Sequence, residues 1–108
     1  MGKNISNPET RSLMEGILTL ETVEECYAFF EDLCTIMELQ DMAQRLDAAV
    51  MLKKGFNYQT ISKEIGISTA TISRVSKCIN YGSGGYNIVL ERIMKDESSD
   101  NAGTDTKE

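Results

Sequence analysis

Apolar residues recur at the three- and four-residue spacing of amphipathic helices along most of the chain. The first helix is predicted to begin after Asn7, which can cap it, with Pro8 at its first position. Glu9 then lies near the positive end of the helix dipole, where a carboxylate is favourable. The apolar stripe of this helix consists of Leu13, Ile17, Leu18 and Leu20.

A second helix is predicted from Thr22, because Glu25 stands three residues later and completes a capping box. We expect this helix to end near Cys34. Its apolar positions are Val23, Cys26, Tyr27, Phe29, Phe30 and Leu33.

The same device, Thr35 with Glu38, opens a longer helix that is predicted to run to Lys54. Gly55 then ends it as a C-cap. The apolar positions of this helix are Ile36, Leu39, Met42, Ala43, Leu46, Ala49, Val50 and Leu52.

Three shorter segments follow. Helices are predicted over 58–65 and 68–79, separated by residues 66–67, and a glycine-rich turn over 81–85 leads into a last helix over 86–95. The apolar positions of that last helix are Ile88, Val89, Ile93 and Met94. No alternation of period two persists over the length of a strand, so the predicted fold is all-α with six helices.

Residues 58–66 meet the demands of the first half of a helix-turn-helix. Ile61 and Ile65 can bury one helix face, and Ser62 is small where the second helix must cross over the first. The turn needs a residue that tolerates positive φ, and Gly66 occupies that position, followed by Ile67 as the buried turn residue.

The second half of the motif is met as well. Ser68 can cap the second helix, and Ile72 and Val75 return to the core at a three-residue spacing. The remaining positions are not needed for the core, and they are Ser68, Thr69, Ala70, Thr71, Ser73, Arg74 and Lys77. Short polar side chains followed by cations suit a recognition helix in the major groove, whereas the simpler alternative is an ordinary helical hairpin with glycine at its bend.

The charges are segregated along the chain, although the net formal charge is −6. Residues 1–43 carry two Lys or Arg against nine Asp or Glu, residues 44–79 carry six against two, and residues 80–108 carry three against six. The basic middle segment suggests a face for an anionic partner, with Lys53, Lys54 and Lys63 as candidate phosphate contacts. Chance clustering on a solvated helix is the alternative.

Composition excludes several other classes of protein. A chain of 108 residues with 41% apolar residues is the size of one domain. No apolar run is long enough for a membrane span or a secretory signal, so we expect a cytoplasmic protein with no membrane partner. The three cysteines are expected to be reduced and to lie in the core.

Enzyme chemistry and metal binding have few candidate residues. The chain has no His, its cysteines are widely spaced, and it has no P-loop or dinucleotide-binding glycine pattern. We therefore expect no catalytic residues, no metal site and no cofactor.

Two stretches, residues 44–46 and 53–76, resemble Trp repressors, most tellingly in Ala-Thr-Ile-Ser-Arg at residues 70–74. The likeness covers about residues 10–95 and is nearest to the YerC/YecD branch of the Trp repressor superfamily. It implies an intertwined homodimer that presents two helix-turn-helix motifs to successive major grooves of a palindromic operator.

The domain is predicted to span residues 8–95, with the helix-turn-helix at 58–79 and the last helix at 86–95, between a flexible N-terminus at 1–7 and an acidic tail at 96–108 whose polar composition predicts disorder. The resemblance implies that residues 8–54 form the dimerisation helices, and it implies further DNA contacts. By the same likeness, Thr69, Ala70, Thr71 and Ser73 would read bases or contact phosphates. Tyr58, Gln59 and Ser62 would lie against the DNA backbone.

Trp repressors hold tryptophan between two arginines, which are matched here by Arg45 and Arg74. The family has glycine directly after the second arginine, whereas this chain has Val75, and Cys78 replaces a ligand-contacting serine. A β-branched side chain should crowd the indole. A small-molecule effector at this pair is thus possible, but we expect it not to be tryptophan.

These observations favour a bacterial, sequence-specific DNA-binding transcriptional regulator that acts as a homodimer on a palindromic operator. The alternative is a protein–protein interaction module that keeps the helix-turn-helix fold and binds another regulator, with the acidic N-terminal third as its contact surface. A steep salt dependence of DNA binding would distinguish the first from the second.

Overall fold

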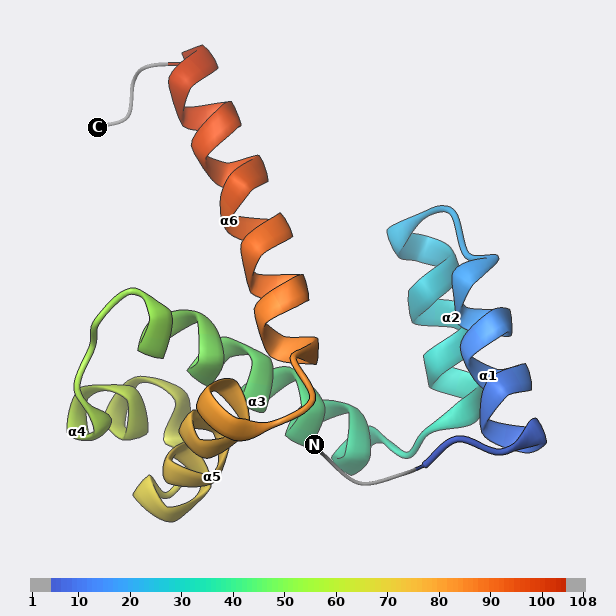
Figure 1. Cartoon of the computed structure of the whole chain (residues 1–108), viewed down its shortest axis with the longest axis horizontal. Helices are drawn as coiled ribbons and strands as arrows, with labels where there is room; N and C mark the ends of the chain where they lie inside the picture. Colours follow the sequence, from blue (N-terminus) through green and yellow to red (C-terminus); the bar gives the residue numbers. More distant parts are fainter. Residues whose placement is uncertain (1–4, 105–108) are drawn as a thin grey trace. The chain divides into compact units, whose positions relative to one another are not determined.

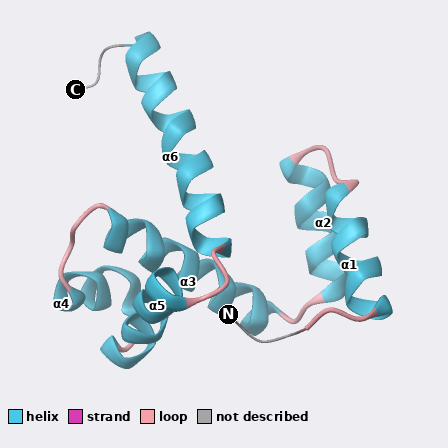
Figure 2. Cartoon of the chain, viewed as in Figure 1, coloured by secondary structure: helices cyan, strands magenta, loops and turns pink. Residues whose placement is uncertain are grey.

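The computed structural model describes residues 5–104, with side chains through residue 97. Figures 1 and 2 show helices and loops and no strand in this range, which confirms the predicted all-α class. The helices are α1 (Pro8–Leu18), α2 (Val23–Leu33), α3 (Ile36–Lys53), α4 (Tyr58–Ile61), α5 (Thr69–Tyr81) and α6 (Gly85–Thr104), with a π-helical turn, η1 (Ser62–Gly66), after α4.

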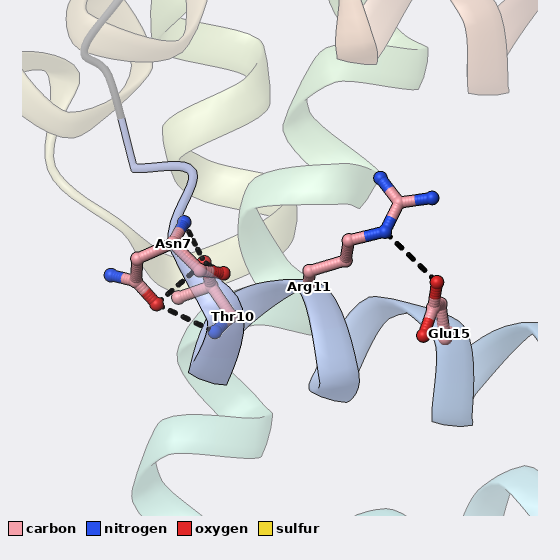
Figure 3. A network of polar contacts seen from close by, with 4 residues as sticks. All are labelled: Asn7, Thr10, Arg11 and Glu15. Atoms are coloured by element: carbon pink, nitrogen blue, oxygen red, sulfur yellow. Dashed lines mark hydrogen bonds and ion pairs between the residues drawn. The ribbon is translucent and has the colours of Figure 1, made fainter.

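Side-chain caps begin the N-terminal helices. At α1, Asn7 Oδ1 accepts from the Thr10 N–H at 2.8 Å and the Asn7 N–H donates to Thr10 Oγ1 at 3.0 Å (Figure 3). Arg11 and Glu15 form an ion pair of 2.9 Å one turn later on the same helix. The predicted Asn7 cap is therefore confirmed, with Thr10 as its reciprocal partner.

The capping boxes predicted for α2 and α3 are met to different degrees. Thr35 and Glu38 exchange two hydrogen bonds, of 2.8 and 3.1 Å. Thr22 Oγ1 accepts from the Glu25 N–H, but the Glu25 carboxylate accepts from the Glu21 N–H, one residue earlier than a reciprocal box requires. Both pairs still satisfy N–H groups that a helix N-terminus leaves without helical partners.

The chain divides into two compact units, residues 2–43 and residues 44–108, and the boundary falls within α3. Among residues 5–43 of the first unit, none is buried. The Phe29 and Phe30 rings meet edge to face at 5.5 Å and are half-buried. Large apolar side chains remain exposed, namely Met14, Leu18, Val23, Tyr27, Leu33, Ile36, Met37 and Met42. The apolar stripes predicted for α1 and α2 are thus only partly covered: half of their residues are half-buried and the other half, Leu18, Val23, Cys26, Tyr27 and Leu33, are exposed.

The second unit contains all the buried residues of the described chain, in two clusters that meet at α3. Ala48 packs with Ile61 of α4 and Ile72 of α5. Its neighbour Ala49 packs with residues of α5 and α6. Two consecutive small residues on α3 let these helices approach closely, so α3 is the support on which the helix-turn-helix rests.

The core face of α6 differs from the prediction. Leu90 is fully buried, whereas Ile88 and Val89 are exposed. Tyr86 packs against the same cluster as Leu90, and Ile93 is half-buried, so the buried positions follow the helical spacing set by Tyr86 and Leu90.

The end of α6 also differs from the predicted last helix at 86–95. The helix continues to Thr104, through residues that were expected to be disordered. No proline interrupts this stretch, so the backbone hydrogen bonds of the helix can continue. The expected flexible N-terminus and disordered tail otherwise concern residues 1–4 and 105–108, which lie outside the described residues.

The cysteines are free, as predicted, but the expectation that they lie in the core is wrong. Cys26 and Cys78 are exposed and Cys34 is half-buried. Cys26 lies on α2, which contains no buried residue, and Cys78 lies on α5, one turn after the buried Val75.

Candidate nucleic-acid interface

The turn of the helix-turn-helix is built on Gly66. Its φ is +87°, a left-handed conformation that side chains with a Cβ rarely adopt, as the sequence predicted. Ser62 Oγ, at the start of η1, donates to the Ile67 carbonyl at 2.6 Å and so holds the first half of the helix-turn-helix against the turn. The predicted helix over 58–65 is divided into four α-helical residues and the wider π-helical turn η1. These features set the direction in which α5 leaves the turn.

The start of α5 is held by Ser68, whose Oγ accepts from the Thr71 N–H at 3.1 Å. Ile72 and Val75 are buried, as predicted. Because successive residues of a helix are rotated by about 100°, the positions opposite these two face solvent. The exposed candidate residues of α5 are Thr69, Ala70, Ser73, Arg74 and Lys77.

Thr71 differs from those five residues because it lies at the flank of the helix and is half-buried. Its hydroxyl oxygen accepts from Ser68 Oγ at 3.1 Å and from Arg74 Nη2 at 3.3 Å. The sequence predicts that Thr71 is free of the core, whereas in the structure it is half-buried and accepts both of these hydrogen bonds.

The cations predicted to meet phosphates are all exposed. Lys53 and Lys54 end α3 and follow it, and Lys63 lies in η1. Lys54 Nζ is 3.9 Å from Glu97 Oε1 of α6, and both side chains are about half exposed. Glu97 therefore competes with any anion that approaches Lys54. Local sequence patterns do not predict this ion pair, because its two residues lie far apart along the chain.

The residues predicted to lie along the DNA backbone from the first helix are only partly available. Tyr58 and Gln59 are exposed on α4, whereas Ser62 is half-buried. The single hydroxyl proton of Ser62 already goes to the Ile67 carbonyl, and a phosphate oxygen accepts hydrogen bonds but donates none. Asn57, whose Oδ1 accepts from the Thr60 N–H at 2.8 Å, caps α4 and was missed, although an Asn just before a helix is a recognisable start signal.

The two arginines of the possible effector pocket, Arg45 on α3 and Arg74 on α5, are both exposed. Val75 is only 2% exposed and packs with Ala49 and Leu90. Its side chain thus occupies core volume directly after Arg74, at the position where the resemblance led us to expect glycine in Trp repressors.

Other kinds of site find no support in the described part of the chain. No group of three or more His, Cys, Asp or Glu residues there is arranged to hold a metal ion. No helix among the described residues is both long and apolar enough to span a membrane.

The family model of the Trp repressor protein matches residues 9–94 of this chain. The chain belongs to the Trp repressor family. The uncharacterized protein YerC of Bacillus subtilis (strain 168) is 51% identical over 90 residues, which cover 83% of this chain and 86% of YerC. The predicted resemblance, including its YerC branch, is therefore confirmed.

Two solved structures of Trp-repressor-like proteins have a similar fold, each with a TM-score of 0.79 over 82% of this chain. One is a Trp repressor candidate from Staphylococcus aureus, which is 47% identical and covered over 89% of its length. The other is a TrpR-like protein from Eubacterium eligens ATCC 27750, which is 43% identical and covered over 92% of its length. The Trp-repressor-like fold predicted from the sequence is confirmed by these similarities.

Proposed function

We propose that this protein is a homodimeric, sequence-specific DNA-binding transcriptional regulator that recognises a palindromic operator. The observation that carries the proposal is the outward face of α5, where three small residues and two cationic residues are exposed on the side away from the buried Ile72 and Val75. Membership of the Trp repressor family supports a DNA-binding regulator and favours regulation over catalysis.

Within this proposal the exposed residues take different roles. Thr69, Ala70 and Ser73 are short enough to let α5 enter the major groove and meet base edges. Lys53, Lys54, Lys63 and Lys77 contact phosphates, and Tyr58 and Gln59 lie along the DNA backbone. Ser62 serves the turn rather than the DNA, because its only proton is already donated.

The dimer is supported by the uncovered apolar faces of residues 5–43. Leu18 is 83% exposed and Ile36 is 75% exposed, and no residue of 5–43 is buried. Several large apolar side chains exposed within one unit are typical of an interface. A second copy of the chain would cover these faces and place two α5 helices on one duplex.

We propose that tryptophan does not regulate this protein. The Val75 side chain supports this proposal, because it is buried against Ala49 and Leu90 and fills the space directly after Arg74. Arg74 is assigned to DNA, and Arg45 remains a candidate contact for another effector.

The proposal is tested by recovering fragments from genomic DNA with the purified protein at two salt concentrations, with and without L-tryptophan. We expect a few palindromic fragments to be enriched, equally with and without the amino acid. Loss of enrichment without tryptophan would overturn the exclusion of that effector. Absence of enriched fragments at both salt concentrations would overturn DNA recognition and favour a protein partner bound by the acidic N-terminal third.

A matched pair of variants then tests whether α5 carries the contact. Lys77→Gln should weaken binding to a selected fragment and lower the slope of log affinity against log salt by about 1, because one phosphate contact is lost. Lys95→Gln makes the same charge change at an exposed position of α6 and should leave the slope unchanged. Equal effects of the two substitutions would show that only the overall charge matters.

A further inference from the structure

Three side chains on one flank of α5 form a continuous chain of hydrogen bonds. Ser68 Oγ donates to Thr71 Oγ1 at 3.1 Å, and Arg74 Nη2 donates to the same Thr71 oxygen at 3.3 Å. The Thr71 N–H donates back to Ser68 Oγ at 3.1 Å. Thr71 is half-buried, so its hydroxyl has a more fixed position than that of an exposed residue.

Arg74 has the longest side chain of the three and the largest number of rotatable bonds. Its side chain is exposed, and a free arginine samples many rotamers that are lost when it binds. The bond to Thr71 uses one of its five N–H donors and leaves the others for DNA. A guanidinium held in this way loses less conformational entropy when it meets a phosphate or a guanine edge.

We propose that Thr71 is a positioning residue: it holds the Arg74 guanidinium against α5, so that Arg74 meets DNA with its conformation already set. This inference rests on the proposed DNA-binding function. It differs from the direct contact that the sequence resemblance implied for Thr71, because here Thr71 acts through Arg74. The half-buried position of Thr71 at the flank of α5, away from the outermost Ala70 and Lys77, supports the indirect role.

A double-mutant cycle separates the two roles. Binding of a DNA fragment selected by the wild-type protein is measured by fluorescence anisotropy for Thr71→Val, Arg74→Ala and the double variant. Valine removes the hydroxyl and nearly preserves the shape. We expect Thr71→Val to weaken binding about three- to tenfold, the size of one net hydrogen bond, and to have no further effect once Arg74 is absent.

Two controls accompany the cycle. Thr71→Ser keeps the hydroxyl and should bind within about twofold of wild type, since the acceptor for Arg74 is retained. Thr69→Val makes the same chemical change at an exposed position outside this hydrogen-bond chain, and its effect should add to that of Arg74→Ala. Circular dichroism and thermal melting verify that each variant is folded.

The outcomes are distinguishable. If Thr71→Val costs the same factor with and without Arg74, or costs nothing in the wild-type background, the positioning role is overturned while the proposed function stands. If the wild-type protein binds no DNA, both fall. If the two substitutions are coupled on both the selected and a scrambled duplex, Arg74 contacts a phosphate. If they are coupled only on the selected duplex, Arg74 contacts a guanine edge. Either result supports the positioning role.

Discussion

Gly66 shows how one residue controls the direction of α5. Its φ of +87° closes the turn after η1, and a Cβ at this position would meet no atom within 4 Å. The requirement for glycine is therefore set by the backbone conformation rather than by space. The Ser62 hydroxyl reinforces the same turn from the preceding helix through its bond to the Ile67 carbonyl.

We expect Gly66→Ala to lower the free energy of unfolding by about 1–2 kcal/mol, because alanine is strained in a left-handed conformation. Urea denaturation measures this change. Gly85→Ala is the matched control, since Gly85 begins α6 without a positive φ and its added methyl group would also meet no atom within 4 Å. That control should be neutral or slightly stabilising. If both variants lost the same free energy of unfolding, the positive φ of Gly66 could not be the reason that glycine is required there.

At the scale of elements, α6 both packs against the core and brings a charged side chain to the candidate interface. It buries Leu90 against α3 and α5, and Asn87 Nδ2 donates to the Ile79 carbonyl of α5 at 2.9 Å. It also brings Glu97 to within 3.9 Å of Lys54. A helix that stabilises the unit of residues 44–108 therefore also places a carboxylate beside one of the candidate phosphate contacts.

Glu97→Gln should tighten DNA binding about two- to threefold at low salt, because Lys54 no longer shares its charge with a carboxylate. The gain should shrink at high salt, where exposed charges are screened. Anisotropy titrations at two salt concentrations measure both effects. Glu91→Gln removes the same charge from an exposed position earlier on α6, and it should have a smaller effect. Identical gains in both variants would assign the effect to net charge alone.

At the scale of the whole molecule, burial is unequally distributed. The six buried residues of the described chain all lie in the unit of residues 44–108, whereas among residues 5–43 the apolar side chains are half-buried or exposed. Helices gain most of their stability from packing an apolar face, so the exposed apolar residues of the first unit need a cover that the first unit itself does not supply. A second copy of the chain is the cover we propose.

We expect sedimentation equilibrium to give twice the chain mass of 12.0 kDa and thermal stability to rise with protein concentration. Ile36→Glu places a charge on the uncovered face of the first unit and should shift the protein toward monomer. Phe56→Glu is the control, because Phe56 is also exposed but lies in the second unit, between α3 and α4. A monomeric wild type, or an unchanged dimer in Ile36→Glu, would contradict the proposed interface.

The sequence by itself determined the helix caps, the turn of the helix-turn-helix and the all-α class, because these features depend on interactions between nearby residues. The caps at Asn7, Thr35 and Ser68 and the positive φ of Gly66 each depend on residues within four positions, and all were predicted. Helical periodicity predicted the all-α class and the buried Ile61, Ile72 and Val75. The segregation of charge and the exposed face of α5 can also be recognised from the sequence, and together they indicated the candidate interface.

Tertiary structure decided which faces and which distant residues meet. Leu90 rather than Ile88 is buried because the packing of α6 against Ala49 and Val75 selects one of two adjacent apolar faces. The Lys54–Glu97 ion pair joins residues far apart in sequence, so no local pattern could indicate it. Spacing within one helix defines its possible faces, but only contacts between helices select the face that is covered and the side chains that remain free to bind.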